Sequence, residues 1–180
     1  MLNEKIIDTV KIDGVEFTII EKPKTLYAGF HNVAPDIESE PDFGDTYNRF
    51  QQGHTKIIDS TTPECMIALS IGYTNWHRIH DAKREAMNCK ETTNPNQPNG
   101  IKVIEAPPCL LIRVKSTDEV WALTKKITGL DYPGHMSPLF GLMGKLFFTP
   151  EHGFTADGKL EMEYYNFDGN QYAAIPVKKI

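Results

Sequence analysis

The chain has 180 residues, of which 40% are hydrophobic and 24% are charged, and its formal net charge at pH 7 is −5. This length predicts one domain over residues 1–180, and the acidic balance argues against nucleic acid, whose partners normally carry a basic surface. No apolar run reaches the about 18 residues that suggest a membrane span, and no secretory signal is recognisable. The three cysteines, Cys65, Cys89 and Cys109, are widely spaced, which favours free thiols and a cytoplasmic location.

The first half of the chain predicts strands and one helix. Phe43, Tyr47 and Phe50 recur at helical spacing and predict a helix within 42–57. Runs rich in β-branched and aromatic residues, bounded by turn-forming residues, predict strands on both sides of this helix. In chain order these strands are expected within 10–23 (a hairpin that turns at Asp13-Gly14), 25–33, 64–76 and 87–91.

The second half begins with a strand over 101–116 that Pro107-Pro108 is expected to bend. The segment STDEVWALTKKITG, residues 116–129, has a Ser/Thr cap, an acidic first turn and lysines near its end, all typical of a helix. A second helix is expected from Pro138 until just before Pro150. The last two strands, 159–167 and 171–180, are joined by Asp168-Gly169-Asn170 as a tight hairpin.

The order strand, helix, strand, strand therefore occurs twice, in modules at about 20–95 and 99–180. The predicted class is α+β, with a mostly antiparallel sheet and helices on one side of it. Two such modules in a pseudo-twofold arrangement would leave a groove between them, which is a natural ligand site.

The strand KLEMEYYNF raises the question of function. Residues i and i+2 of a strand share a face, so Glu161, Glu163 and Tyr165 point one way, opposite the apolar face. These carboxylates either face water or lie among aromatic side chains, where they would receive an organic cation through charge and cation–π attraction. The other aromatic side chains that could line such a site are Tyr73, Trp76, Phe147, Phe148 and Tyr172.

Other chemistry is weakly signalled. His77 and His80 form an HxxH pair next to Asp81, but two histidines need a further ligand to hold a metal, so no metal is predicted. The cysteines have no histidine nearby in a recognisable nucleophile motif, and phosphate-binding or dinucleotide-binding glycine loops are absent. We therefore assign no catalytic residue and no cofactor from motifs.

The segments NGIKVIEAPPCLLIRV and EHGFTADGKLEMEYYNFDGNQYAAIPVKK resemble the GyrI-like small-molecule-binding domain. This is the effector-binding module of AraC-type and MerR-type transcription regulators, and it also occurs alone. The resemblance covers about residues 99–178 and rests on Gly153-Phe154, Met162 to Tyr165 and Ile175 to Lys178. It implies two strand-helix-strand-strand (SHS2) modules around a pocket whose glutamate meets cationic, aromatic, lipophilic compounds. The usual tryptophan of the preceding helix is replaced here by residues such as Leu142, Leu146 and Phe147.

By this resemblance Glu163 is the ligand's counter-ion and Tyr165 its aromatic neighbour, whereas Glu161 is expected to reach solvent. Tyr73, Trp76 and Phe147 are candidate walls. The expected function is a stand-alone protein that binds amphipathic cations in drug or toxin sensing, sequestration or regulation, without direct nucleic-acid or membrane contact. Two alternatives remain: a hydrolase of electrophilic small molecules that uses the same glutamate, and a module that only binds a protein partner.

Overall fold

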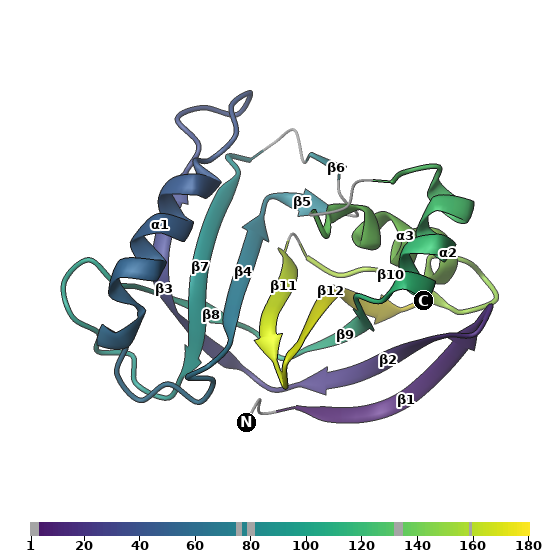
Figure 1. Cartoon of the computed structure of the whole chain (residues 1–180), viewed down its shortest axis with the longest axis horizontal. Helices are drawn as coiled ribbons and strands as arrows, with labels where there is room; N and C mark the ends of the chain where they lie inside the picture. The colour runs from purple at the N-terminus through teal and green to yellow at the C-terminus, as the bar shows by residue number, and fades with distance from the viewer. Residues whose placement is uncertain (1–3, 75–76, 79–81, 132–134, 159) are drawn as a thin grey trace.

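The computed structural model describes residues 4–74, 77–78, 82–131, 135–158 and 160–180 (Figure 1). The helices within these ranges are α1 (Phe43–Gly53), the 3-10 helix η1 (His54–Lys56), α2 (Asp118–Thr128) and α3 (Ser137–Phe147). The strands are β1 (Lys5–Ile12), β2 (Val15–Lys22), β3 (Thr25–Val33), β4 (Met66–Ile71), β5 (Tyr73–Thr74), β6 (His77–Arg78), β7 (Glu85–Thr92), β8 (Lys102–Ala106), β9 (Cys109–Lys115), β10 (Phe154–Ala156), β11 (Leu160–Phe167) and β12 (Asn170–Lys179).

Ten of these strands form one sheet in the order β1-β2-β9-β12-β11-β4-β7-β3-β8, with β10 added beside β12. The pairs are antiparallel throughout the part of the chain that the structure describes. The middle of the sheet is symmetric in its connections, because β9, β11 and β12 of the second half match β3, β4 and β7 of the first half. The α+β class with a mostly antiparallel sheet is therefore as predicted, and the second half differs from the expected order because it has two helices, α2 and α3, and the short strand β10 between β9 and β11.

One expected strand, 101–116, is wrong. It is two strands, β8 and β9, which lie at distant places in the sheet. β8 pairs with β3 at one edge, whereas β9 lies between β2 and β12. Pro107 and Pro108, which separate them, have no backbone N–H for a sheet hydrogen bond, so the ladder ends there and the chain crosses to the other half.

The helix ends follow the signals in the sequence. The Asp42 side chain accepts a hydrogen bond from the Asp45 backbone N–H at 2.8 Å and caps α1. Thr117 caps α2 in the same way, and the helix ends at Gly129, whose φ of 74° suits a residue without a Cβ. Within the described ranges, no helix combines the length and apolarity needed to span a membrane.

The helices cover the two ends of one sheet face. Figure 1 shows α1 at one side of the molecule and α2 and α3 at the other, with β4 and β11 between them. α1 packs on β3 and β7, whereas α3 packs on β12 and β10. In the part of the chain that the structure describes, no helix packs closely on the central strands β4 and β11. This uncovered strip is where a site can form.

Candidate functional site

A row of directly paired residues crosses the sheet and shows how this strip arises. Cross-strand partners point to the same face. In strand order from β2 to β3, the row is Phe17, Val114, Ala173, Glu163, Ala68, Asn88 and Phe30. Its ends are apolar and buried under the helices, whereas its centre carries a carboxylate and an amide. The sequence thus places Glu163 at the centre of the helix-bearing face, between the two helical layers.

A cavity of about 550 Å³ lies over this centre, and we call it the acidic cavity. It is bounded by the N-terminal part of α1, by α3 and by β4, β7 and β11. The described residues that line it are Glu40, Phe43, Ala68, Leu69, Ser70, Tyr73, Met87, Asn88, His135, Ser137, Phe140, Glu161, Glu163 and Tyr165. Three of these side chains are carboxylates, four are aromatic, and neither lysine nor arginine is among them.

Glu163 and Tyr165 form a hydrogen-bonded pair in this cavity. They are two residues apart on β11, and the Tyr165 hydroxyl donates to Glu163 Oε2. Burial raises the pKa of Glu163 above the usual glutamate value, although the Tyr165 hydrogen bond and the nearby His135 act in the opposite direction. Burial and the adjacent Glu163 raise the pKa of Tyr165, which therefore remains a neutral donor. No lysine or arginine forms an ion pair with Glu163 in the ranges that the structure covers.

Glu161 also lines the acidic cavity, which corrects the expectation that it reaches solvent. Only 3% of its surface is exposed, so it is well buried. The alternation of β11 correctly placed both glutamates on one face. What the alternation could not indicate is that β11 is a central strand, paired with β4 and β12, so that its glutamate face lies beneath other elements.

Glu40 comes from the loop before α1 and was not predicted from the sequence. The Tyr73 hydroxyl donates to Glu40 Oε2, and Nε of the fully buried Arg84 lies 3.4 Å from the same atom. Arg84 also donates to the Ser39 carbonyl from Nε at 3.1 Å and from Nη2 at 2.5 Å. The guanidinium therefore holds this loop over the cavity and offsets the charge of Glu40. An isolated glutamate in a Pro-punctuated loop gave no signal of this role.

Of the three aromatic residues predicted as candidate walls of the ligand site, one lines the acidic cavity, one lies outside the described residues and one is in the core. Tyr73 lines the acidic cavity as proposed from the sequence. Trp76 lies outside the described residues, as do His80 and Asp81 of the HxxH segment. Phe147 does not line the cavity: its side chain is 0% exposed, and its ring packs at 5.2 Å from that of Phe17 in the core. The last turn of α3 turns this phenylalanine toward the sheet.

Two aromatic walls were missed. Phe43 begins α1 and Phe140 lies in α3, so they enter the acidic cavity from opposite helices. Phe43 is 45% exposed, which is unusual for a phenylalanine that only builds a core. The helical spacing of Phe43 and Tyr47 was the available signal, but spacing alone does not tell a core face from a ligand-facing one.

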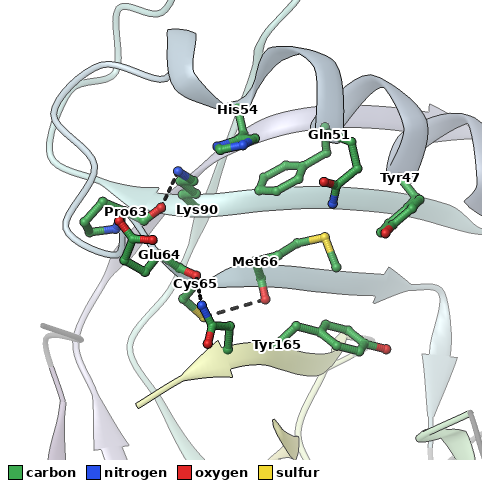
Figure 2. Close-up of a pocket in the computed structure, with 11 residues that line it drawn as sticks. Tyr47, Gln51, His54, Pro63, Glu64, Cys65, Met66, Lys90 and Tyr165 are labelled. Carbon is green, nitrogen blue, oxygen red and sulfur yellow. Dashed lines mark hydrogen bonds between the residues drawn. The ribbon is translucent and has the colours of Figure 1, made fainter. Parts of the chain in front are cut away.

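A second cavity, of about 460 Å³, lies along the same strands toward η1, and we call it the Lys90 cavity (Figure 2). The described residues that line it are Tyr47, Phe50, Gln51, His54, Pro63, Glu64, Cys65, Met66, Lys90, Tyr165 and Asn166. Figure 2 shows Tyr47, Gln51 and His54 on α1 and η1 facing Met66 and Tyr165 on β4 and β11. Tyr165 belongs to both cavities, so it forms the boundary between them.

The cysteines are not activated. Burial raises the pKa of the Cys65 thiol to about 11, and burial also raises the pKa of the Cys89 and Cys109 thiols. Cys65 and Cys89 belong to the buried core on the sheet face opposite the helices, and Cys65 also reaches the edge of the Lys90 cavity. Nucleophilic thiols normally have depressed pKa values. These residues therefore act as packing groups, as expected from their apolar strands.

Comparisons with known proteins add evidence on the fold. No protein-family model and no curated protein matches the chain. Among solved structures, a putative bacterial transcription regulation protein from Staphylococcus aureus MU50 has a TM-score of 0.54 at 12% identity, with 92% of this chain and 99% of that chain covered. SAV2435 bound to tetraphenylphosphonium has a TM-score of 0.53 at 11% identity, with 90% and 93% covered.

A third similar structure is an integron cassette protein from Vibrio cholerae, with a TM-score of 0.52, 12% identity, and 90% and 95% of the two chains covered. The sequence identities are too low to indicate more than the fold. The resemblance of the C-terminal motifs predicted this fold correctly. The structural neighbours of the chain are GyrI-like, effector-binding proteins, and it shares their fold.

Proposed function

We propose that this protein binds amphipathic, cationic, aromatic small molecules in the acidic cavity. The observation that carries the proposal is Glu163: a half-buried carboxylate, with a pKa raised by burial, in a cavity with aromatic walls and, among the residues described, no lysine or arginine in its lining. A buried carboxylate without a cation is unfavourable, and an organic cation would supply the missing charge.

The aromatic walls suit the same class of ligand. Phe43, Tyr73, Phe140 and Tyr165 line the cavity beside the carboxylates. Each ring that faces a cation contributes roughly 0.5–2 kcal/mol through cation–π attraction, and flat apolar ligand surface adds hydrophobic burial. The cavity volume of about 550 Å³ lies within the roughly 300–1,000 Å³ range of small-molecule sites. Because a cavity is present beside Glu163, a purely protein-binding module is the less favoured alternative.

The experiment compares two ions of nearly the same shape and opposite charge, tetraphenylphosphonium and tetraphenylborate. The phosphonium is the ligand named with the similar structure of SAV2435. We expect this protein to bind the phosphonium and to bind the borate far more weakly, as measured by isothermal titration calorimetry. Glu163→Gln should weaken phosphonium binding by roughly 10- to 100-fold, because a charged partner is lost while the shape of the side chain is kept.

Glu21→Gln is the matched control, because Glu21 is an exposed glutamate on β2, away from the cavity. It removes the same net charge and should leave phosphonium affinity unchanged. Equal affinity for the two ions, or an equal loss in the Glu21 and Glu163 variants, would contradict the proposal. The expected roles of such binding are sensing or sequestering toxic cations, with any signal passed to a protein partner.

A second candidate function is hydrolysis of reactive electrophiles. The raised pKa of Glu163 and its hydrogen bond with Tyr165 favour it, since a general acid–base group works best with a pKa nearer to neutrality. The test is product formation beyond one equivalent per protein, abolished by Glu163→Gln. Stoichiometric binding without turnover would leave the protein as a binder alone.

A further inference from the structure

The Lys90 cavity and the acidic cavity are successive compartments along the same three strands. Met66 pairs with Tyr165 in one compartment, and Ala68 pairs with Glu163 in the other. The β7 residues follow the same register, because Asn88 pairs with Ala68 and lines the acidic cavity. Tyr165 lines both compartments, so a ligand that fills one has the other as its neighbour.

The two compartments differ in charge. Lys90 is 5% exposed and lines the second one, where its Nζ donates to the Pro63 carbonyl at 2.5 Å. No carboxylate forms an ion pair with Lys90 in the described part of the chain, and Glu64, which lines the same cavity, is exposed to solvent. Burial lowers the pKa of Lys90, and the carboxylate of Glu64 acts in the opposite direction. Within the described ranges Lys90 has no ion-pair partner, in contrast to the buried Lys22, which pairs with Glu91 at 2.5 Å.

His54 provides a second polar group without a partner. Its Nδ1 is buried and has no hydrogen-bond partner among the residues described. Its ring stacks on Phe50 with centroids 5.2 Å apart, which fixes its position at the end of the cavity. Figure 2 draws His54 and Lys90 at the same end of the Lys90 cavity. A buried ammonium and a buried ring nitrogen together suit a hydrogen-bond acceptor, and a carboxylate best of all.

The spacing of the strands sets the length of such a ligand. In the register of β4 and β7, Lys90 lies opposite Met66, two residues along from the level of Glu163 and two strands across from β11. A rise of about 3.3 Å per residue and about 4.8 Å between strands place the two Cα atoms about 12 Å apart. The side chains of Glu163 and Lys90 both project from the helix-bearing face of the sheet. A ligand with a short linker could therefore place its cation near Glu163 and its anion near Lys90.

We propose that the ligand class of this protein is zwitterionic: an aromatic cation in the acidic cavity joined by an apolar linker to a carboxylate in the Lys90 cavity. This inference rests on the proposed function and adds to it the second charge and the second compartment. Without the Lys90 cavity, a carboxylate on the ligand would only be repelled by Glu163 and the other acidic side chains. With it, the carboxylate meets the ammonium group of Lys90, which has no ion-pair partner within the described residues.

The test compares hexyltriphenylphosphonium with (5-carboxypentyl)triphenylphosphonium, which have chains of equal length and differ in the terminal carboxylate. We expect the wild-type protein to bind the acid at least as tightly as the alkyl compound in calorimetric titrations. Lys90→Met keeps the length of the side chain and removes its charge. This variant should lower the affinity for the carboxylated compound by roughly tenfold or more and leave the affinity for the alkyl compound nearly unchanged.

His54→Phe is the second variant, since a phenyl ring can still stack on Phe50. It should lower the affinity for the carboxylated compound by a smaller factor and leave the affinity for the alkyl compound unchanged. Thermal unfolding without ligand checks that both variants fold. If the alkyl cation binds but the ratio of the two affinities is the same in the wild type and both variants, this inference is overturned and the proposed function stands. If neither compound binds the wild type, the proposed function fails and this inference fails with it.

Discussion

Two carboxylates on opposite faces of the same sheet, one buried and one half-buried, differ in whether the described part of the protein supplies a cation for them. Glu91 on β7 is 2% exposed and accepts a hydrogen bond from Lys22 Nζ on β2 at 2.5 Å. In the sheet order, β9, β12, β11 and β4 lie between these strands, so the sheet curls until its two halves meet across this face. Glu163, on the face that bears the helices, contacts the Tyr165 hydroxyl and lies near His135, and it forms no ion pair with a lysine or arginine among the described residues. By our proposal the first charge holds the fold together, whereas the second serves a ligand.

On the face opposite the helices, the protein binds one of its own cations with the same kinds of groups that line the acidic cavity. The Arg113 guanidinium lies 2.7 Å from Glu4 and between 5.1 and 5.9 Å from the ring centroids of Tyr164, Phe167 and Tyr172. A carboxylate and several aromatic rings thus surround a cation that belongs to the protein itself. In the acidic cavity the carboxylates and rings are present, and the cation would come from outside.

The largest effect should come from breaking the structural pair. Glu91→Gln removes the near counter-charge of the buried Lys22 and leaves it the more distant Glu4 Oε2 at 3.9 Å, so we expect a loss of about 3–5 kcal/mol in the free energy of unfolding. Urea denaturation followed by circular dichroism measures this loss. Phosphonium binding should be unchanged wherever the variant is still folded, because Glu91 lies on the opposite face.

The control replaces both partners, Lys22→Met with Glu91→Leu. Since an apolar pair of similar volume avoids the desolvation of two charges, its stability should lie much closer to that of the wild type than to that of Glu91→Gln. If the double variant is as unstable as the single one, the loss in the free energy of unfolding does not come mainly from the unpaired charge of Lys22, and the apolar replacements do not fit that face.

The next effect concerns binding and pH. Because burial raises the pKa of Glu163, its carboxylate takes up a proton at a higher pH than an exposed glutamate does, which titrates near about 4.3. Affinity for tetraphenylphosphonium should therefore fall, by roughly tenfold or more, as the pH decreases through this raised pKa. Titrations at a series of pH values measure the effect.

Glu163→Gln is the control for this pH dependence, because it removes the carboxylate and keeps the rest of the cavity. The decrease in affinity on acidification should be largely lost in this variant. An unaltered pH profile would show that the pH dependence comes from another group, and it would remove Glu163 from the role of counter-ion.

The sequence was sufficient for those features that depend on local patterns. Alternation placed Glu161, Glu163 and Tyr165 on one face of a strand, and caps such as Thr117 and Gly129 marked a helix correctly. The repeated order of strands and helices predicted a groove, and a cavity lies over β4, β7 and β11 between α1 and α3. These signals are local because they arise from backbone geometry and from groups a few residues apart.

What the sequence could not provide depends on contacts between distant segments. The burial of Glu161 follows from the central position of β11, and the core position of Phe147 from the rotation of α3 against the sheet. Glu40 enters the cavity because Arg84, far along the chain, binds the loop before it. Lys90 lies within the expected strand 87–91 but was not singled out, and only the pairing of β7 with β4 brings it into the same cavity as Tyr165.

The smallest effect, and the sharpest contrast with Glu91, is on stability at Glu163. A raised pKa in the folded state means that folding favours the protonated form, so the ionised carboxylate lowers stability as the pH rises through that pKa. Glu163→Gln removes this cost, and its side-chain carbonyl can still accept the Tyr165 hydrogen bond. Near neutral pH we expect the ligand-free variant to be as stable as the wild type or more stable, by up to about 1 kcal/mol. Urea denaturation at neutral and at acidic pH measures this difference, which should shrink on acidification. A loss comparable to that of Glu91→Gln would instead show that Glu163 holds the fold together, and the distinction between the two carboxylates would not stand.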